Sequence, residues 1–119
     1  MVVLAEVDPP FRMLRIVIGL HEARAILAGW QGAAPGRPST WDLFVAAVAL
    51  LGGHIERVVI TAVEEARHYY ANLEIDDGAE RRTLACRPSD GLALAVRLPG
   101  TEILCEPSVL DAAGVLPDN

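Results

Sequence analysis

Apolar and polar positions follow two periodicities along this chain, alternation and helical spacing, and the changes between them mark the predicted elements. Alternating or continuous apolar runs rich in β-branched residues predict strands over residues 2–7, 13–18, 55–63, 69–75, 81–86 and 102–105. Apolar residues at helical spacing, bounded by Pro and Gly, predict helices over residues 21–30, 40–51, 89–97 and 107–114. The Gly- and Pro-rich stretch 32–38 is expected to be a loop.

The predicted order of elements is therefore ββααβββαβα. Strands that come in runs, rather than in strict alternation with helices, are typical of the α+β class, with helices packed on a mixed or mostly antiparallel sheet. The turn signal Asp77-Gly78 favours a meander, and the segments 55–63 and 69–75 are expected at the centre of the sheet. A chain of 119 residues is long enough for a single domain, predicted over residues 1–119.

Composition adds expectations about assembly and location. The hydrophobic fraction of 52% is high for so small a domain, so we expect a homo-oligomer whose interface covers part of the apolar surface. The uninterrupted apolar run Phe44–Leu51 is too short to span a membrane and predicts a core helix face. The first residues lack the basic region of a signal peptide, which makes the cytoplasm the expected location.

Charge and cysteine content narrow the chemistry. A formal net charge of −6 argues against a broad basic surface for nucleic acid, so any binding of a polyanion must rest on a local cationic site. Cys86 and Cys105 are not in a CxxC pair and are expected to be reduced, inert thiols. The three histidines lack metal-ligand spacing, which makes a zinc site improbable.

One phrase occurs twice, as Arg37-Pro38-Ser39-Thr40-Trp41-Asp42 (the first box) and as Arg87-Pro88-Ser89-Asp90 (the second box). Each box opens a predicted helix, with Ser39 or Thr40 capping one and Ser89 capping the other. Each places an aspartate in the first turn, where the helix dipole favours negative charge. Free N–H groups beside an Arg and a carboxylate would also suit a phosphate or a metal ion. The pattern fits a structural and a functional interpretation alike.

The functional interpretation predicts a site where the first turns of three helices meet. Divalent Mg²⁺ or Mn²⁺ would bind to carboxylates, with Arg side chains and capping hydroxyls facing a phosphate. The candidate metal-binding and catalytic carboxylates are Glu22, Asp42 and Asp90, with His21 as a possible general acid or base. The candidate phosphate-binding residues are Arg37, Arg87, Ser39, Thr40 and Ser89. The structural alternative makes the same residues helix caps and dipole partners.

Five short motifs stand in a recognisable order. They are Ile18-Gly19 with Glu22-Ala23 and Ala25-Ile26, the first box with Leu43, Val58-Val59-Ile60, Tyr70-Ala71 before Leu73, and the second box before Ala93-Leu94-Ala95. Over nearly the whole chain this order resembles the bifunctional nuclease family, also called DUF151. The resemblance implies an α+β domain that self-associates and a nuclease acting on RNA, DNA or both, the activities assigned to plant members.

The chain departs from the family pattern at four places. Trp41 stands where the family commonly has His, Ala85 and Ala62 stand where Asp is frequent, and Gly91 replaces a common Ala. If those polar residues serve catalysis in relatives, activity here is reduced or lost. Two hypotheses therefore follow: a metal-dependent nuclease, and a non-catalytic oligomeric domain that binds a small anion or a protein partner.

Overall fold

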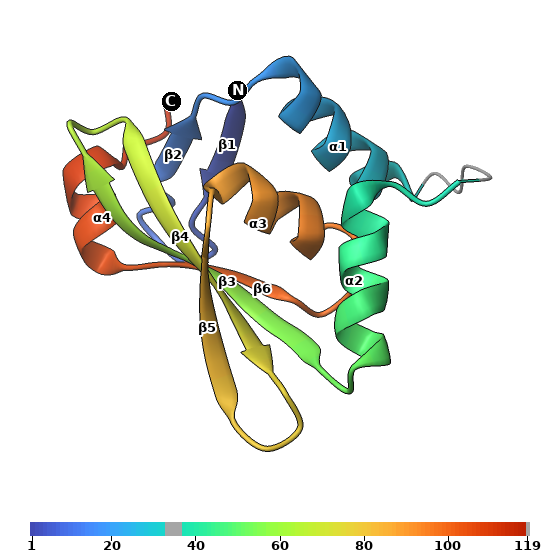
Figure 1. The fold of residues 1–119 in the computed structure, drawn as a ribbon. Helices are drawn as coiled ribbons and strands as arrows, with labels where there is room; N and C mark the ends of the chain where they lie inside the picture. The colour runs from blue at the N-terminus through green and yellow to red at the C-terminus, as the bar shows by residue number, and fades with distance from the viewer. Residues whose placement is uncertain (33–36, 119) are drawn as a thin grey trace.

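The computed structural model describes residues 1–32 and 37–118, and its elements follow the predicted order (Figure 1). The strands are β1 (Val2–Ala5), β2 (Met13–Ile16), β3 (His54–Glu64), β4 (His68–Asp76), β5 (Arg81–Cys86) and β6 (Glu102–Cys105). The helices are α1 (Leu20–Gln31), α2 (Thr40–Leu50), α3 (Pro88–Ala95) and α4 (Pro107–Ala113). The α+β class and the order ββααβββαβα are confirmed. The predicted loop 32–38 falls partly on residues 33–36, which lie outside the described residues.

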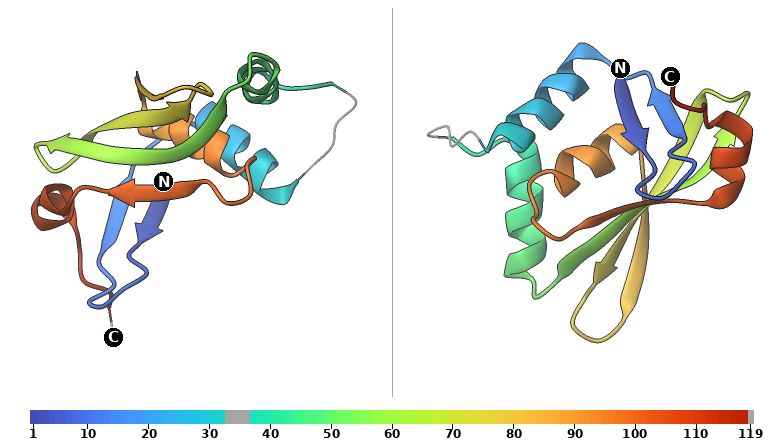
Figure 2. Two further views of the ribbon diagram at one scale, coloured as in Figure 1. Left: turned by 90° about the horizontal axis from the view of Figure 1, so that it is seen from below. Right: turned by 180° about the vertical axis from the view of Figure 1, so that it is seen from behind.

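The main sheet is four-stranded and mixed, in the order β5-β4-β3-β6. β3, β4 and β5 form the predicted antiparallel meander, and β3 and β4 lie at the centre as expected. β6 pairs with β3 in parallel, with Val58 opposite Ile103. β1 and β2 form the predicted hairpin, which is a separate two-stranded sheet. Figure 2 shows this hairpin and α4 gathered at the end of the main sheet away from α2.

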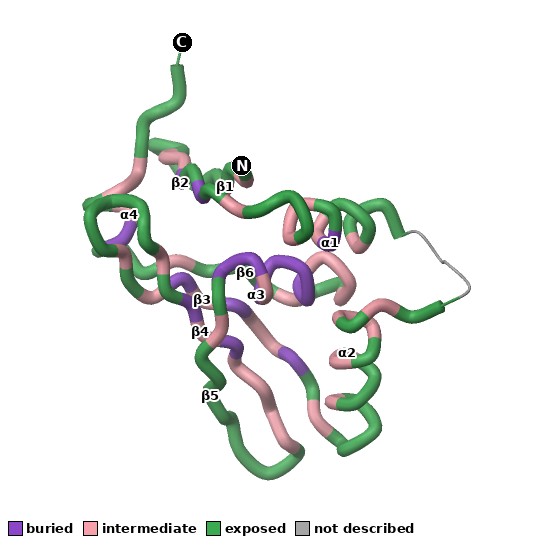
Figure 3. Tube along the Cα trace, turned by 45° about the horizontal axis from the view of Figure 1, so that its top comes forward, coloured by how far each residue is buried: buried purple, intermediate pink, exposed green. Residues whose placement is uncertain are grey.

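Two apolar clusters hold these layers together. One cluster joins the central strands to α3 and α2, and in it Val58 of β3 and Leu73 of β4 pack with Leu94 of α3. The other joins the central strands to the hairpin and α4, with Ile60 and Val109 fully buried at its centre. α3 is the most deeply buried helix in Figure 3, because it lies between the sheet and α1. The residues at the start of α3 are therefore held in a fixed position.

The outer face of α2 is exposed and apolar, as Figure 3 shows in green. Leu50 and Leu51 are 86% and 83% exposed, so the prediction that the run Phe44–Leu51 forms a core face holds only for its inner side. Helical periodicity explains the difference, since Phe44, Val45 and Val48 pack against the core while the other residues of the run are exposed. The expected homo-oligomer stays a prediction. None of the helices in the described ranges combines the length and the apolarity needed to cross a membrane.

Candidate phosphate site at the start of two helices

Arg87 joins the first turns of α1 and α3. Its guanidinium donates two hydrogen bonds to the Asp90 carboxylate, from Nε at 3.0 Å and from Nη2 at 2.9 Å. Its third nitrogen, Nη1, donates to Glu22 Oε1 at 3.3 Å, across 65 positions of sequence. The two carboxylates hold the pKa of Arg87 above its ordinary value, mainly through the bonds to Asp90. Two predicted site residues from distant segments thus meet on one exposed cation.

The second box opens its helix differently from the prediction. Ser89 was expected to cap α3, but the N-cap residue is Arg87 and Pro88 occupies the first helical position, so that prediction is wrong. Proline suits this position because its fixed φ angle fits a helix and it has no N–H to leave unpaired. Ser89 is buried in the first turn. No side chain in the described part of the chain caps α3.

A pocket of about 360 Å³ opens where these helices begin; we call it the polar pocket. The end of β2, the start of α1, the start of β4 and the start of α3 line it. Its polar lining side chains are Glu22, Arg67, His68, Tyr69, Tyr70, Arg87 and Ser89. The α1 N-cap, Gly19, also lines it, and a Cβ there would clash with the Glu22 carboxylate. The N-termini of two helices without side-chain caps thus open beside Arg87.

In the first box, Ser39 and Asp42 hydrogen-bond to each other. Ser39 caps α2 in a complete capping box: its N–H donates to Asp42 Oδ2 at 2.7 Å, and its Oγ accepts from the Asp42 N–H at 3.2 Å. The other carboxylate oxygen of Asp42 accepts from Arg97 Nε at 3.0 Å. These bonds, those from Ser39 first, hold the pKa of Asp42 below its ordinary value of 3.8. Asp42 therefore pairs with Arg97, whereas Glu22 and Asp90 pair with Arg87.

Arg97 ties three helices together. Its Nη1 donates to the carbonyl oxygens of Ala25 in α1 at 3.0 Å and of Ala93 in α3 at 2.7 Å, while Nε holds Asp42 of α2. Its guanidinium also lies 5.9 Å from the centroid of the Trp41 ring. With a side chain only 9% exposed, Arg97 is a structural residue that the sequence did not single out.

The remaining predicted residues are placed as follows. Arg37 is exposed before α2 and forms no ion pair within the described residues. Thr40 lines a second pocket, which also contains Arg87 and Asp90. His21 is exposed on α1, next to Glu22, and is not part of the lining of the polar pocket.

The positions of the His, Cys, Asp and Glu side chains test whether the protein could hold the predicted metal ion. Within residues 1–32 and 37–118, no three His, Cys, Asp or Glu side chains are grouped so that they could hold a metal ion. Glu22 and Asp90 share a guanidinium that already balances their charge. The residues of the described chain therefore do not fit a metal centre built from three or more protein ligands.

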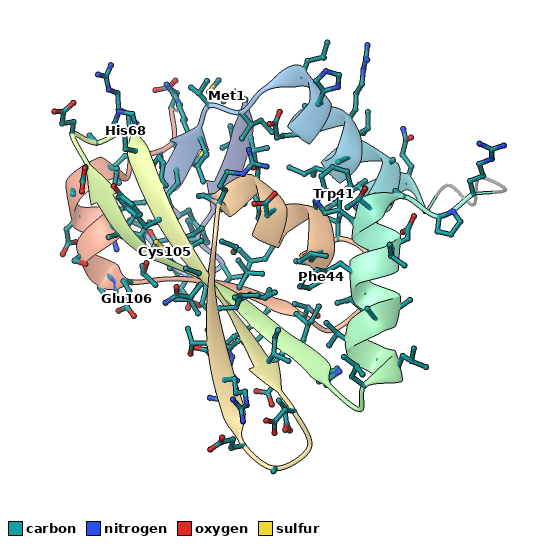
Figure 4. All side chains as sticks on the ribbon, viewed as in Figure 1. Met1, Trp41, Phe44, His68, Cys105 and Glu106 are labelled. Carbon is teal, nitrogen blue, oxygen red and sulfur yellow. The ribbon has the colours of Figure 1, made fainter. Side chains whose placement is uncertain are left out.

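Four polar residues of the polar pocket were missed by the sequence interpretation: Arg67, His68, Tyr69 and Tyr70, from the β3–β4 turn and the start of β4. His68 is labelled at the start of β4 in Figure 4. The neighbouring Glu64 carboxylate raises the pKa of Tyr70. Only Tyr70 carried a signal, because it belongs to the motif Tyr70-Ala71. Arg67 and His68 carry no spacing that could have indicated the site.

The cysteines match the expectation of unreactive thiols. Cys86 and Cys105 are both free and half-buried, at the ends of β5 and β6. Burial raises the pKa of both thiols above the ordinary value, which disfavours the nucleophilic thiolate.

Comparison with known proteins places the whole chain in one family. A family model described as the bifunctional nuclease domain matches residues 2–118. An uncharacterised protein of Mycobacterium tuberculosis, found in two strains, is 41% identical over 105 residues, which are 88% of this chain and 61% of that protein. A (2Z,6E)-hedycaryol synthase of Kitasatospora setae is 37% identical over 103 residues, 79% of this chain but only 28% of the synthase. The chain thus spans less than two thirds of the length of the curated relatives it matches, and it belongs to the bifunctional nuclease domain family.

Proposed function

We propose that the polar pocket binds a phosphodiester of RNA or DNA and that the chain cleaves it. The observation that carries this proposal is the position of Arg87, an exposed guanidinium between the uncapped N-termini of α1 and α3. Helix N-termini direct free N–H groups and a positive dipole end toward an anion, and a guanidinium donates paired hydrogen bonds to phosphate oxygens. Membership of the bifunctional nuclease domain family supports the same substrate class.

The pocket offers groups for each task of phosphodiester cleavage. Arg87 releases Asp90 or Glu22 when a phosphate takes their place, and it then stabilises the charge that develops on the phosphate oxygens. Glu22 and His68 line the pocket on different elements, and these two side chains are suited to moving protons to and from the reacting oxygens. Because the net charge is −6, the attraction of a polyanion must come from local cations, and Arg87 and Arg67 both line the pocket.

The experiment is a cleavage assay with labelled single-stranded RNA and DNA, with Mg²⁺ or Mn²⁺ added and with EDTA. We expect Arg87→Gln to slow cleavage by about 100-fold or more, the usual cost of removing one donor that stabilises a developing negative charge. Glu22→Gln and His68→Ala are expected to slow it as well. The EDTA arm decides whether a divalent cation is needed.

The matched control is Arg82→Gln. Arg82 is an exposed arginine near the start of β5, and it pairs with Asp77 and Glu80 of the preceding turn. It lines neither the polar pocket nor the second pocket. Its loss changes the net charge as much as the loss of Arg87 and is expected to leave cleavage unchanged. A parent chain that cleaves neither substrate, or cleavage indifferent to Arg87, would refute the nuclease proposal.

A second candidate function is binding of nucleic acid without cleavage. It is favoured by one observation: both carboxylates next to the pocket are already neutralised by Arg87, so neither is free to activate water unless Arg87 moves. In that case Arg87→Gln abolishes oligonucleotide binding while the parent binds and does not cleave. The same set of variants therefore separates the two functions.

A further inference from the structure

A second pocket opens on the other side of Arg87; we call it the apolar pocket. Its volume is about 420 Å³, within the range of about 300 to 1,000 Å³ that is typical of small-ligand sites. α2, α3, β4 and the edge strand β5 form it. Its polar lining residues are Thr40, Arg87 and Asp90, and the exposure of Thr40 and Arg87 places its mouth there. The apolar lining residues are Trp41, Phe44, Leu73, Leu84, Ala85, Cys86 and Leu94.

Two aromatic side chains stand on one side of this pocket. Trp41 and Phe44 are three positions apart on α2, so they lie one turn above the other, and Figure 4 shows both on the side of α2 that faces α3. Trp41 is fixed by the Arg97 guanidinium near its ring. Leu73 and Leu94 are buried below them. The pocket is thus built before any ligand arrives.

We propose that the apolar pocket takes a nucleobase of single-stranded nucleic acid whose phosphate lies at Arg87. This inference rests on the proposed binding of a phosphodiester at that residue. Arg87 lines both pockets, so a nucleotide held there by its phosphate has the apolar pocket as the nearest place for its base. The base stacks on an aromatic ring, while Thr40 and Asp90 at the mouth offer a hydroxyl and a carboxylate to its polar edge.

The charge of the chain favours this occupant. A net charge of −6 weakens the contribution of phosphate contacts to the affinity for nucleic acid, whereas stacking of a base on an aromatic ring needs no positive charge. A base in a duplex is paired and stacked on both faces, so it reaches a pocket only if it is flipped out. The apolar pocket therefore selects single strands over duplexes.

Trp41 itself reports on the pocket. The chain has two tryptophans, and the other, Trp30, is 76% exposed on α1 and lies outside the lining of the apolar pocket. In a Trp30→Phe background, titration with an eight-residue oligothymidylate is expected to quench the fluorescence of Trp41 to saturation. An abasic strand of equal length is expected to bind roughly tenfold more weakly or worse, without quenching, since it lacks the stacked base. Equal affinity and equal quenching for both strands would overturn the proposal.

Substitutions on α2 supply the second measurement. Phe44→Ala removes part of the aromatic side and is expected to weaken binding of the oligothymidylate roughly tenfold while the abasic strand binds as before. The abasic affinity measured on the same variant shows that the fold and the Arg87 site are intact. Leu43→Ala, at an exposed position of the same helix outside the pocket, is the matched control and should change neither affinity.

The outcomes separate this inference from the nuclease proposal. Quenching and discrimination against the abasic strand without any cleavage would support the base pocket and refute the nuclease. Cleavage that ignores Phe44, with no quenching of Trp41, would refute the base pocket and leave the nuclease standing. A chain that neither cleaves nor binds the oligonucleotide refutes both. A duplex of the same length that quenches Trp41 as strongly as the single strand refutes the proposed selectivity.

Discussion

The two boxes share Arg-Pro-Ser and an aspartate, but a different one of these residues occupies the helix N-cap in each. In both helices the aspartate occupies the third helical position and reaches back to the side chain of its N-cap residue. In the first box that residue is Ser39, which exchanges hydrogen bonds with Asp42 and closes the helix end. In the second box it is Arg87, whose side chain is 63% exposed and also contacts Glu22.

The identity of the N-cap residue decides whether the start of the helix is closed by a side chain or left open for an anion. In the first box the Ser39 hydroxyl accepts from the Asp42 N–H while Asp42 accepts from the Ser39 N–H, which closes the capping box of α2. A guanidinium at the same place can satisfy the carboxylate but cannot accept from the backbone N–H groups, so the helix end stays open to an anion. The Ser39–Asp42 pair of the first box therefore serves stability, and Arg87 of the second box is where we expect the phosphate to bind. Three measurements test this division.

The largest effect is expected from Asp42→Ala. This substitution removes the capping box of α2 and leaves Arg97, a nearly buried cation, without its carboxylate. We expect the free energy of unfolding to fall by about 2–3 kcal/mol, measured by urea denaturation. Asp90→Ala is the matched change in the second box and should leave stability close to the parent, because its partner Arg87 is exposed. Equal losses in both variants would break the comparison.

The next effect concerns the residue that follows each aspartate. A Cβ at Gly91 would lie 2.6 Å from Val58 Cγ1, a fully buried side chain, so Gly91→Ala forces either Val58 or α3 to shift. We expect a loss of about 1–2 kcal/mol in urea denaturation, since overpacking outweighs the helix preference of Ala. Leu43→Ala, at the corresponding exposed position of α2, should cost less than about 0.5 kcal/mol. Gain of stability in Gly91→Ala would contradict the close packing of α3.

The smallest effect is a change in pH dependence. Ser39 and Arg97 hold the pKa of Asp42 below its ordinary value, so the ionised carboxylate stabilises the folded chain at neutral pH. That contribution is lost as the pH falls through the lowered pKa. Asp42→Asn is therefore expected to flatten the loss of stability between roughly pH 5 and pH 2, followed by urea denaturation at each pH. A residual slope should remain, because Asp77 has a pKa of about 2. Parallel profiles for parent and variant would show that Asp42 does not act in this way.

Local signals in the sequence predicted most of the fold. Alternation and turn residues placed the meander, and Pro107 marked the first helical position of α4, as observed. The same signals misplaced the start of α3, because Arg-Pro-Ser can put either Ser or Arg at the N-cap. Gly91 lies so close to Val58 that a Cβ there would clash, so tertiary packing on the sheet constrains the position of the first turn of α3. Such a contact is not visible in a local pattern.

The site was harder to predict than the fold. Asp90 and Glu22 could be proposed as partners, because each lies in the first turn of a helix and the helices were expected to begin near one another. Nothing in the sequence predicted that Asp42 would be held by Arg97, 55 positions away, or that His68 would reach the polar pocket. The first of these neighbours follows from how α2 packs against α3, and the second from where the β3–β4 turn lies, and tertiary packing of either kind has no short-range signature.

The Arg97 clamp has a consequence for protein engineering. Its anchors are two backbone carbonyl oxygens and the Asp42 carboxylate, and none of these residues lines the apolar pocket. Backbone anchors do not change when side chains are exchanged, so the frame around the pocket tolerates new residues on its walls. Positions 41 and 85 both lie on those walls, as Trp41 and Ala85. Exchange of Trp41 or Ala85 is therefore expected to reshape the apolar pocket without removing the hydrogen bonds by which Arg97 joins the three helices.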